Sequence, residues 1–368
     1  PTYCSIQTTS TVNGLTSNIP ATATVVQAYL LWSHSNQTAD TQVTFEGQTV
    51  NAEVVYGASM SGGRQFYGMM SDVTSIISGI ADPTNNVYDF TGLTVDNTNS
   101  VASYCSTGTV LGGWSLIVFY EEPSYPAVSI NMYHGFRGES NTSRSYTLDG
   151  FYAIGSTGAK TTVLSWEGDS TLNGSSGGTT NPNGEALSVT NQGGTTTVLS
   201  GDGGQTGNNA YNSTIYNNTP SGTVNYSDSW GVDMDTFDIS PYISAADSQI
   251  TVNVHTGQDF VIANMVLVKV PSNLIVGNIF EDIDYGGGAG RDLATSGGTG
   301  IDNTRVELFD NSGALEEFTM SDATGEYSFG GMANGNYSVR VVNGSISSNR
   351  GGGGSCSACY PVQTYRRN

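Results

Sequence analysis

The stretch that decides the fold is Val276-Gly277-Asn278-Ile279-Phe280-Glu281-Asp282-Ile283-Asp284-Tyr285-Gly286, near the end of this 368-residue chain. Three related segments follow it: 300–309 (GIDNTRVELF), 321–329 (SDATGEYSF) and 334–341 (NGNYSVRV). Each joins alternating apolar residues to a turn rich in Gly, Asn and Asp, which is typical of short strands. The sequence therefore predicts a compact all-β domain over residues 273–343.

The same strand pattern extends upstream, so we expect a large β-sandwich, jelly-roll-like in architecture, over residues 1–270. Residues 25–32 fit a buried strand, and the apolar run 115–120 fits a central strand. Residues 42–50 fit a hairpin that turns at Glu46-Gly47. The best helix candidate is short, at 71–77, with Ser71 or Asp72 as its cap.

Composition limits the function. Charged residues are 12% of the chain, the formal net charge is −21, and the only lysines are Lys160 and Lys269. So few cations exclude nucleic-acid binding and attraction to an anionic membrane surface. No apolar run reaches the ~20 residues that a membrane span needs. An acidic chain that begins at Pro1 without Met fits an exported extracellular protein whose signal has been removed.

Four cysteines fit two disulfides in an oxidising compartment. The preferred pairs are Cys4 with Cys105 and Cys356 with Cys359. For the second pair, a redox motif and half of a zinc site are the alternatives. Neither has support nearby, because glycines precede the motif and no matching ligand pair follows.

The segments quoted for 273–343 resemble the prealbumin-like B-type repeats of bacterial surface adhesins (the Cna B or SdrD B type). This resemblance implies a seven-stranded, Ig-like sandwich that serves as a stalk or spacer. Residues 28–32, 71–74 and 113–123 resemble a large β-rich module that precedes such repeats in bacterial secreted surface proteins. That second resemblance informs architecture and location only.

In the SdrD-like branch, an acidic loop after the first strand binds calcium. The matching residues here are Asp282, Asp284 and Asp292, and the weaker candidates are Asp302 and Asp322. Alternate carboxylates in a glycine-containing loop can converge on one hard cation. Glycines stand at 286–288, where the family usually has further Asp or Asn, so a solvated acidic turn remains the alternative to Ca²⁺.

The sequence offers no enzyme constellation. His34, His134 and His255 stand far apart in the sequence, and no nucleophile-elbow motif accompanies them. We therefore predict that the chain is not an enzyme.

The tail 344–368 is glycine-rich and has Arg366 and Arg367 just before its last residue, Asn368. The assembly residues we predict in it form a strand that adds to the sheet edge of another copy: Tyr360, Val362, Thr364 and Tyr365. The first functional hypothesis is thus the repeating subunit of a cell-surface filament or layer. The alternative is a monomeric adhesin or carbohydrate-binding module for surface glycans. Asn-x-Ser/Thr sequons make a glycoprotein conceivable, with no preferred site.

Overall fold

The computed structural model describes residues 4–7, 9–15, 19–122, 124–172, 184–201, 205, 207–219, 225–226, 229–282, 291–333 and 335–346. Strands dominate, in six sheets. The helices are α1 (Thr74–Ser78) and α2 (Leu293–Ser296), with the 3-10 turns η1 (Ser240–Tyr242) and η2 (Asn343–Ser345). The all-β sandwich fold expected from the sequence is confirmed, and no described helix is long and apolar enough to cross a membrane.

Two sheets form the first part of the chain. Sheet 1 has the order β1-β7-β3-β4, and its strands are β1 (Thr9–Asn13), β7 (Val87–Thr91), β3 (Gln42–Phe45) and β4 (Gln48–Asn51). Sheet 2 has the order β5-β6-β2-β8, and its strands are β5 (Val54–Met60), β6 (Arg64–Asp72), β2 (Thr24–Ser35) and β8 (Gly112–Glu121).

Two more sheets follow. Sheet 3 has the order β15-β14-β16-β11-β18-β9, and its strands are β15 (Asn225–Tyr226), β14 (Ile215–Asn218), β16 (Val232–Asp238), β11 (Lys160–Trp166), β18 (Val261–Pro271) and β9 (Val128–Glu139). Sheet 4 has the order β10-β17-β12-β13, and its strands are β10 (Ser143–Leu148), β17 (Ile250–His255), β12 (Ala186–Thr190) and β13 (Thr196–Val198).

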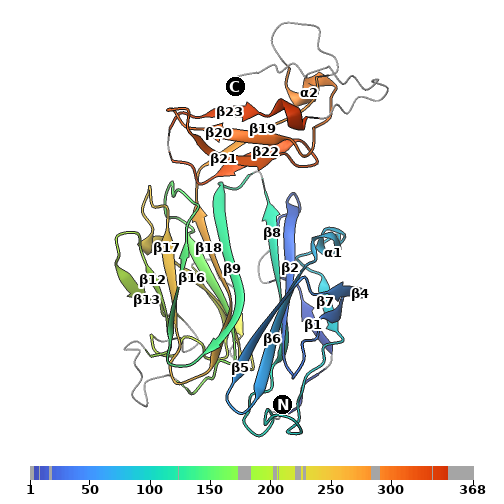
Figure 1. Ribbon diagram of the computed structural model, residues 1–368, viewed down its shortest axis with the longest axis vertical. Helices are drawn as coiled ribbons and strands as arrows, with labels where there is room; N and C mark the ends of the chain where they lie inside the picture. The colour runs from blue at the N-terminus through green and yellow to red at the C-terminus, as the bar shows by residue number, and fades with distance from the viewer. Residues whose placement is uncertain are drawn as a thin grey trace.

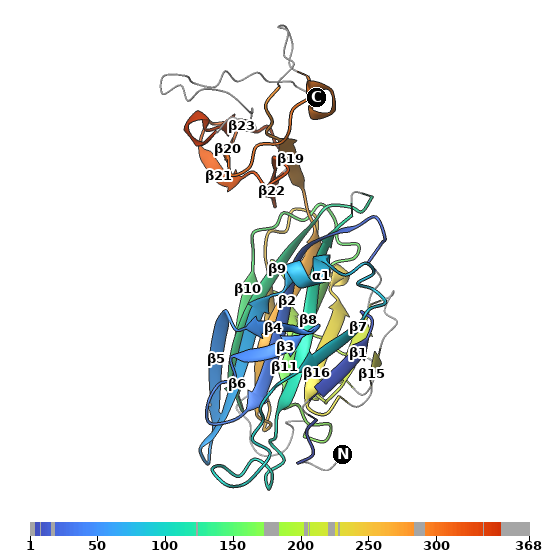
Figure 2. The ribbon, with the colours of Figure 1, turned by 90° about the vertical axis from the view of Figure 1, so that its right-hand side faces the viewer.

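These four sheets stack as layers with a core in each gap (Figures 1 and 2). Trp32 and Phe45 lie in the core between sheets 1 and 2. Leu31 and Trp166 lie between sheets 2 and 3, and Leu187 lies between sheets 3 and 4. We expected one large sandwich over 1–270, and the structure instead places two sandwiches face to face there.

Strand β8 corrects the expectation of a central strand at 115–120. It pairs with β2 and stands at the end of sheet 2 among the described residues. Its run is apolar because both of its faces are covered. Leu116 and Val118 pack into the core on one side, while Ile117 packs into the core on the other. Burial on two faces gives a continuous apolar run whether or not a strand has two neighbours.

The hairpin at 42–50 is confirmed. Strands β3 and β4 pair from Gln42 opposite Asn51 to Phe45 opposite Gln48. Glu46 and Gly47 both have positive φ, 51° and 70°, as a two-residue turn matched to the strand twist requires. The expected helix begins later, at Thr74, and the predicted cap was wrong, because the N-cap is Val73 and not Ser71 or Asp72. Asp72 Oδ1 does accept the Thr74 N–H, at 2.7 Å.

A separate small sandwich follows, drawn above the four layers in Figure 1. One of its sheets pairs β19 (Leu274–Asn278) with β22 (Glu326–Gly330). The other has the order β21-β20-β23, with strands β21 (Leu315–Met320), β20 (Arg305–Phe309) and β23 (Ser338–Val341). Ile279, Val306, Leu308 and Phe329 form its core.

The close packing around Gly300 can be tested by substitution. A Cβ at Gly300 would lie 1.7 Å from the carbonyl oxygen of Thr324, which is backbone and has little room to yield. We therefore expect Gly300→Ala to lower the free energy of unfolding by about 3 kcal/mol, as severe overpacking does. Hydrogen exchange of peptides from this domain in the full chain measures it. Gly335→Ala is the matched control, because its Cβ meets no atom closer than 3.4 Å; equal protection in both variants would contradict the prediction.

Candidate functional site

The acidic residues predicted to bind calcium are spread over the small domain. Asp282 accepts two hydrogen bonds from Arg291, from Nη2 at 2.7 Å and from Nε at 3.2 Å. Asp292 is the N-cap of α2, where its Oδ1 accepts the Thr295 N–H at 2.9 Å. Both carboxylates thus have protein partners, and Asp284 lies outside the described residues.

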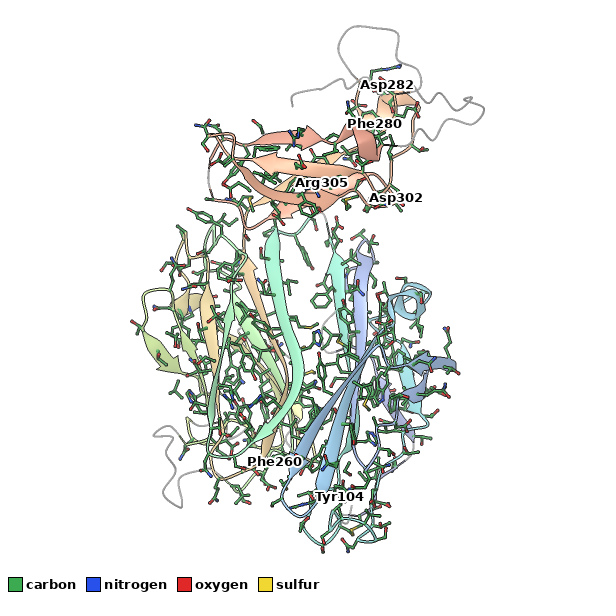
Figure 3. All side chains as sticks on the ribbon, viewed as in Figure 1. Tyr104, Phe260, Phe280, Asp282, Asp302 and Arg305 are labelled. Atoms are coloured by element: carbon green, nitrogen blue, oxygen red, sulfur yellow. A yellow bond between two sulfur atoms is a disulfide. The ribbon has the colours of Figure 1, made fainter. Side chains whose placement is uncertain are left out.

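The weaker calcium candidates, Asp302 and Asp322, are not grouped with Asp282 and Asp292. Asp322 Oδ1 instead stabilises the turn in which it lies, because it accepts hydrogen bonds from the N–H groups of Thr324 and Glu326. Asp302 is exposed, and Figure 3 draws it on the side of the small domain nearer the four layers, away from Asp282. Within the described ranges, no three or more His, Cys, Asp or Glu side chains are already grouped to hold a metal ion. A calcium ion at this loop therefore stays a prediction.

The remaining predictions concern the disulfides and the residues of the tail. Cys4 and Cys105 form a disulfide with a Cα–Cα distance of 5.4 Å, which is the pairing preferred from the sequence. Figure 3 labels the neighbouring Tyr104 at the end of the body opposite the small domain. Cys356 and Cys359, and the predicted assembly residues Tyr360, Val362, Thr364 and Tyr365, lie outside the described residues.

Sheet edges offer places where a further strand can pair. Strand β21 stands at the end of its sheet in the small domain. Its apolar side chains are unusually open to solvent, with Leu315 and Phe318 each 51% exposed and Met320 43% exposed. At the opposite end of the chain, β1 stands at the edge of sheet 1 with every side chain exposed. Exposed edges of this kind are templates for pairing with another chain.

The histidines have structural surroundings. His34 Nδ1 lies 2.6 Å from the Thr94 carbonyl oxygen, and burial lowers its pKa. His134 Nδ1 lies 2.9 Å from the Tyr56 hydroxyl. His255 lies between Ser143 and Ser188, at 2.8 and 2.9 Å, and burial lowers its pKa too. Among the described residues, none of these three rings makes a hydrogen bond or an ion pair with a carboxylate, so the arrangement of a Ser-His-Asp triad is not met at any of them.

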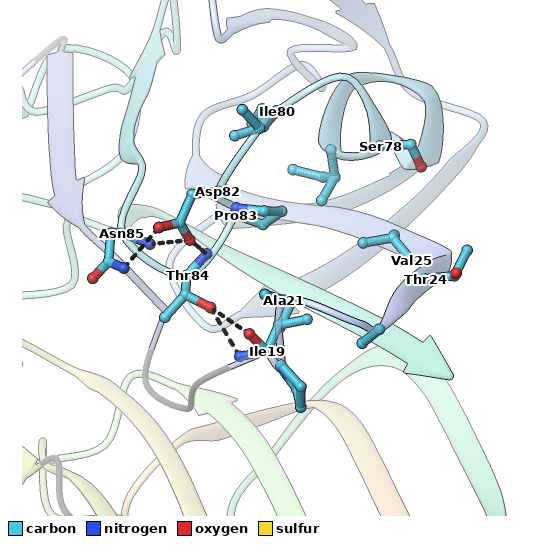
Figure 4. A pocket seen from close by; sticks show the side chains of 14 residues that line it. Ile19, Ala21, Thr24, Val25, Ser78, Ile80, Asp82, Pro83, Thr84 and Asn85 are labelled. Atoms are coloured by element: carbon cyan, nitrogen blue, oxygen red, sulfur yellow. Dashed lines mark hydrogen bonds between the residues drawn. The ribbon is translucent and has the colours of Figure 1, made fainter. Parts of the chain in front are cut away.

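A hollow of about 830 Å³ lies beside α1 and the start of β2 (Figure 4). The hydroxyl of Thr84 spans its wall by donating to the Ile19 carbonyl at 3.2 Å and accepting the Ile19 N–H at 2.8 Å. Asp82 is the one titratable residue in its lining, and it accepts hydrogen bonds from Asn85 and from the Thr84 N–H. A lone carboxylate among apolar side chains does not supply the paired groups of an acid–base site.

Sequence reasoning missed a group of buried carboxylates at one end of sheets 3 and 4. Glu185 and Asp233 are 0% and 1% exposed, and Asp259 is 6% exposed. Burial, reinforced by Asp259, Asp233 and Asp169, raises the pKa of Glu185 to about 10. Burial, reinforced by Asp169, raises the pKa of Asp259 to about 7. Carboxyl groups with strongly raised pKa values tend to cluster at functional sites, so this group is a candidate site.

Comparison with known proteins bears on the small domain. The family model for the SdrD B-like domain matches residues 275–354, which agrees with the resemblance drawn from the sequence. This family consists of structural modules of cell-surface proteins rather than enzymes. No curated protein matches the chain.

Among solved structures, the T6 backbone pilin of serotype M6 Streptococcus pyogenes, described as a modular three-domain structure decorated with variable loops and extensions, is 11% identical to this chain. The alignment covers 92% of this chain and 77% of the pilin, with a TM-score of 0.15. A likeness at that score carries no argument about this chain.

Proposed function

We propose that this protein is a structural subunit of an extracellular filament or layer, in which copies join end to end. The observation that carries the proposal is the SdrD B-like domain at one end of a stack of four sheets. The Cys4–Cys105 disulfide adjoins Tyr104, which Figure 3 labels at the opposite end of the body. A body whose two ends carry different surfaces suits head-to-tail repetition, which builds open filaments.

The contact we propose is strand addition onto β21. Among the described strands, β21 pairs only with β20 within its sheet, and it carries the exposed side chains of Leu315, Phe318 and Met320. Backbone hydrogen bonds to an added strand supply affinity, and alternate side chains supply specificity. The donor proposed is the tail 344–368 of the next copy, whose Arg366 and Arg367 would meet an acidic surface.

Electron microscopy of the native protein tests this function. We expect regular filaments from the wild-type chain and single particles from Leu315→Lys/Met320→Lys, because charge on an edge strand blocks pairing. The matched control is Val87→Lys. Val87 is 50% exposed, but it lies on β7, an inner strand of sheet 1, where it is paired with Asn13 of β1. Single particles from the wild type would overturn the filament and favour the monomeric adhesin.

A further inference from the structure

The further inference concerns the end of sheets 3 and 4 that lies farthest from the small domain. Trp166 ends β11 and pairs with both Val232 of β16 and Ile262 of β18. Gly168 and Asp259 lie just beyond these pairs, and Asp233 lies one pair inside them, opposite Ser165, so all three lie at the same end of the sandwich. Figure 3 labels Phe260, the neighbour of Asp259, at that end. Glu185 arrives from the other sheet, immediately before β12.

Two of these carboxylates each have one oxygen that is hydrogen-bonded and one that is not. Glu185 Oε1 accepts the Tyr211 N–H at 2.9 Å, while Oε2 is buried without a hydrogen-bond partner. Asp233 Oδ1 accepts the Thr214 N–H at 3.1 Å, while Oδ2 is also buried without one. Burying a polar oxygen without a hydrogen-bond partner costs free energy, so we expect a proton or a cation to be bound at each of these oxygens.

Tyr211 connects the two acids. Its N–H donates to Glu185, and its carbonyl oxygen lies beside Gly168, as Asp233 Oδ2 does. The position that a Cβ on Gly168 would take lies 2.2 Å from Asp233 Oδ2 and 2.6 Å from the Tyr211 oxygen. Any side chain at position 168 would occupy the space beside these two oxygens, so only glycine leaves that space open. Two electron-rich oxygens turned to one place repel each other unless a proton or a cation lies between them.

Asn209 adds a neutral oxygen to the group. Its backbone forms a parallel bridge with Glu185, and its side-chain Nδ2 donates to the Ser170 carbonyl at 3.3 Å. Its Oδ1 is buried without a hydrogen-bond partner. Three buried oxygens without a hydrogen-bond partner thus lie at this end of the sandwich, on Glu185 just before β12, on Asp233 of β16 and on Asn209.

No side-chain cation compensates the two acids among the described ion pairs, none of which involves Glu185, Asp233 or Asp259. Arg64 lowers the pKa of the nearby Glu167, whose pKa burial nevertheless raises to about 8. Lys160 stands at the opposite end of β11 from Trp166, roughly 20 Å away at the usual rise per residue of a strand. Buried charges without a partner are strongly destabilising.

We propose that Glu185 and Asp233, together with the Tyr211 carbonyl and the Asn209 side-chain oxygen, bind a divalent cation, and that the cation is calcium. The carboxylates alone are not grouped as a cage, so carbonyl and amide oxygens and water complete the shell. An all-oxygen donor set selects hard cations over zinc or copper. Mixed carboxylate, amide and backbone donors from several loops suit the larger, irregular shell of Ca²⁺ better than the strict octahedron of Mg²⁺.

Calorimetric titration of the full chain with CaCl₂, after treatment with a chelator, tests the site. Hydrogen exchange with and without CaCl₂ then locates any ion in the wild-type protein. We expect calcium to slow exchange in peptides covering 166–172 and 207–216. Slowing confined to peptides around 279–282 and 291–296 would assign the ion to the small domain and overturn this proposal.

The second measurement uses the double variant Glu185→Gln/Asp233→Asn, which keeps the shapes of both side chains and removes both of their charges. We expect this variant to bind calcium at the 166–216 region at least ~10-fold more weakly, since ligand charge sets affinity. Asp282→Asn/Asp292→Asn is the matched control, and it should leave that affinity unchanged. Wild-type affinity in Glu185→Gln/Asp233→Asn, or no calcium binding by the wild type, would show that the two groups are kept as neutral acids. Failure of the filament test would leave this result untouched.

Discussion

In the protein freed of divalent cations by a chelator, we expect the free energy of unfolding to rise as the pH falls from about 8 to about 5. Burial, reinforced by Asp259, Asp233 and Asp169, raises the pKa of Glu185 to about 10. Its unfolded value is ~4.3. Between these values the folded chain keeps the proton that the unfolded chain releases. Stability is therefore greatest at low pH and is lost as pH rises toward the folded pKa, by about 1.4 kcal/mol per pH unit for each such group.

Other buried carboxyl groups at the same end of sheets 3 and 4 also have raised pKa values, and they change the free energy of unfolding with pH in the same direction. Burial, with Asp235 nearby, raises the pKa of Asp233 well above its usual value, although backbone N–H groups at 212–214 oppose the shift. Burial also raises the pKa of Asp235 to about 8. Carboxyl groups with lowered pKa, such as Asp310 beside Ser312, lose their contribution only below their ordinary range. Burial lowers the pKa of His34 and His255, so these two residues oppose the rise in stability below about pH 6.5. The buried acids with raised pKa outnumber them and set the direction over the window from 5 to 8.

Chemical denaturation at several pH values measures this slope. Glu185→Gln/Asp233→Asn, whose amides do not titrate, should flatten it and should be more stable than the wild type at pH 8 in chelator. Saturating CaCl₂ should also flatten the wild-type slope, because the bound ion favours the ionised carboxylates. A wild-type slope that is flat in chelator, or that stays unchanged in the double variant, would contradict the prediction.

Much of the strand pattern was predictable because it depends on local chemistry. The hairpin at 42–50 followed from two strand-like runs around Glu46-Gly47, and both turn residues do have positive φ. The small domain followed from motifs in a fixed order, and the family match covers it. The stacking of four sheets was not predictable, because an apolar run such as 115–120 shows that both faces of a strand are covered without showing what covers them.

The buried carboxylates were harder to predict because their signal is split among distant segments. Glu185 precedes β12 in a stretch dominated by Gly, Ser, Thr and Asn, and Asp259 stands in a turn. Strand β16 did contain a signal. Asp233 and Asp235 alternate with Val232 and Met234, so they share a face with Phe237, which lies in the core between sheets 3 and 4. Two acids at inward positions of a strand require neutralisation, and that pattern points to a site.

The seam between sheets 2 and 3 is expected to show strong coupling between Gly68 and Phe136. Phe136 of β9 is 5% exposed, and its ring lies against the backbone of Gly68 on β6. A Cβ at Gly68 would lie 2.3 Å from Cδ2 of that ring. We expect Gly68→Ala to cost about 3 kcal/mol of unfolding free energy through overpacking. Phe136→Ala should cost about 4 kcal/mol through the cavity it leaves.

The double variant should lose less than the two single losses added together, by at least ~1 kcal/mol, because the new methyl group enters space that the ring has vacated. Gly135→Ala is the matched control. Gly135 adjoins Phe136, yet its Cβ would meet no atom within 4 Å, so its effect should add to that of Phe136→Ala. Additive losses for Gly68 and Phe136 would mean that the ring swings aside. Strong coupling would mean that the two sandwiches are locked into one stiff body, as a subunit that transmits load along a filament requires.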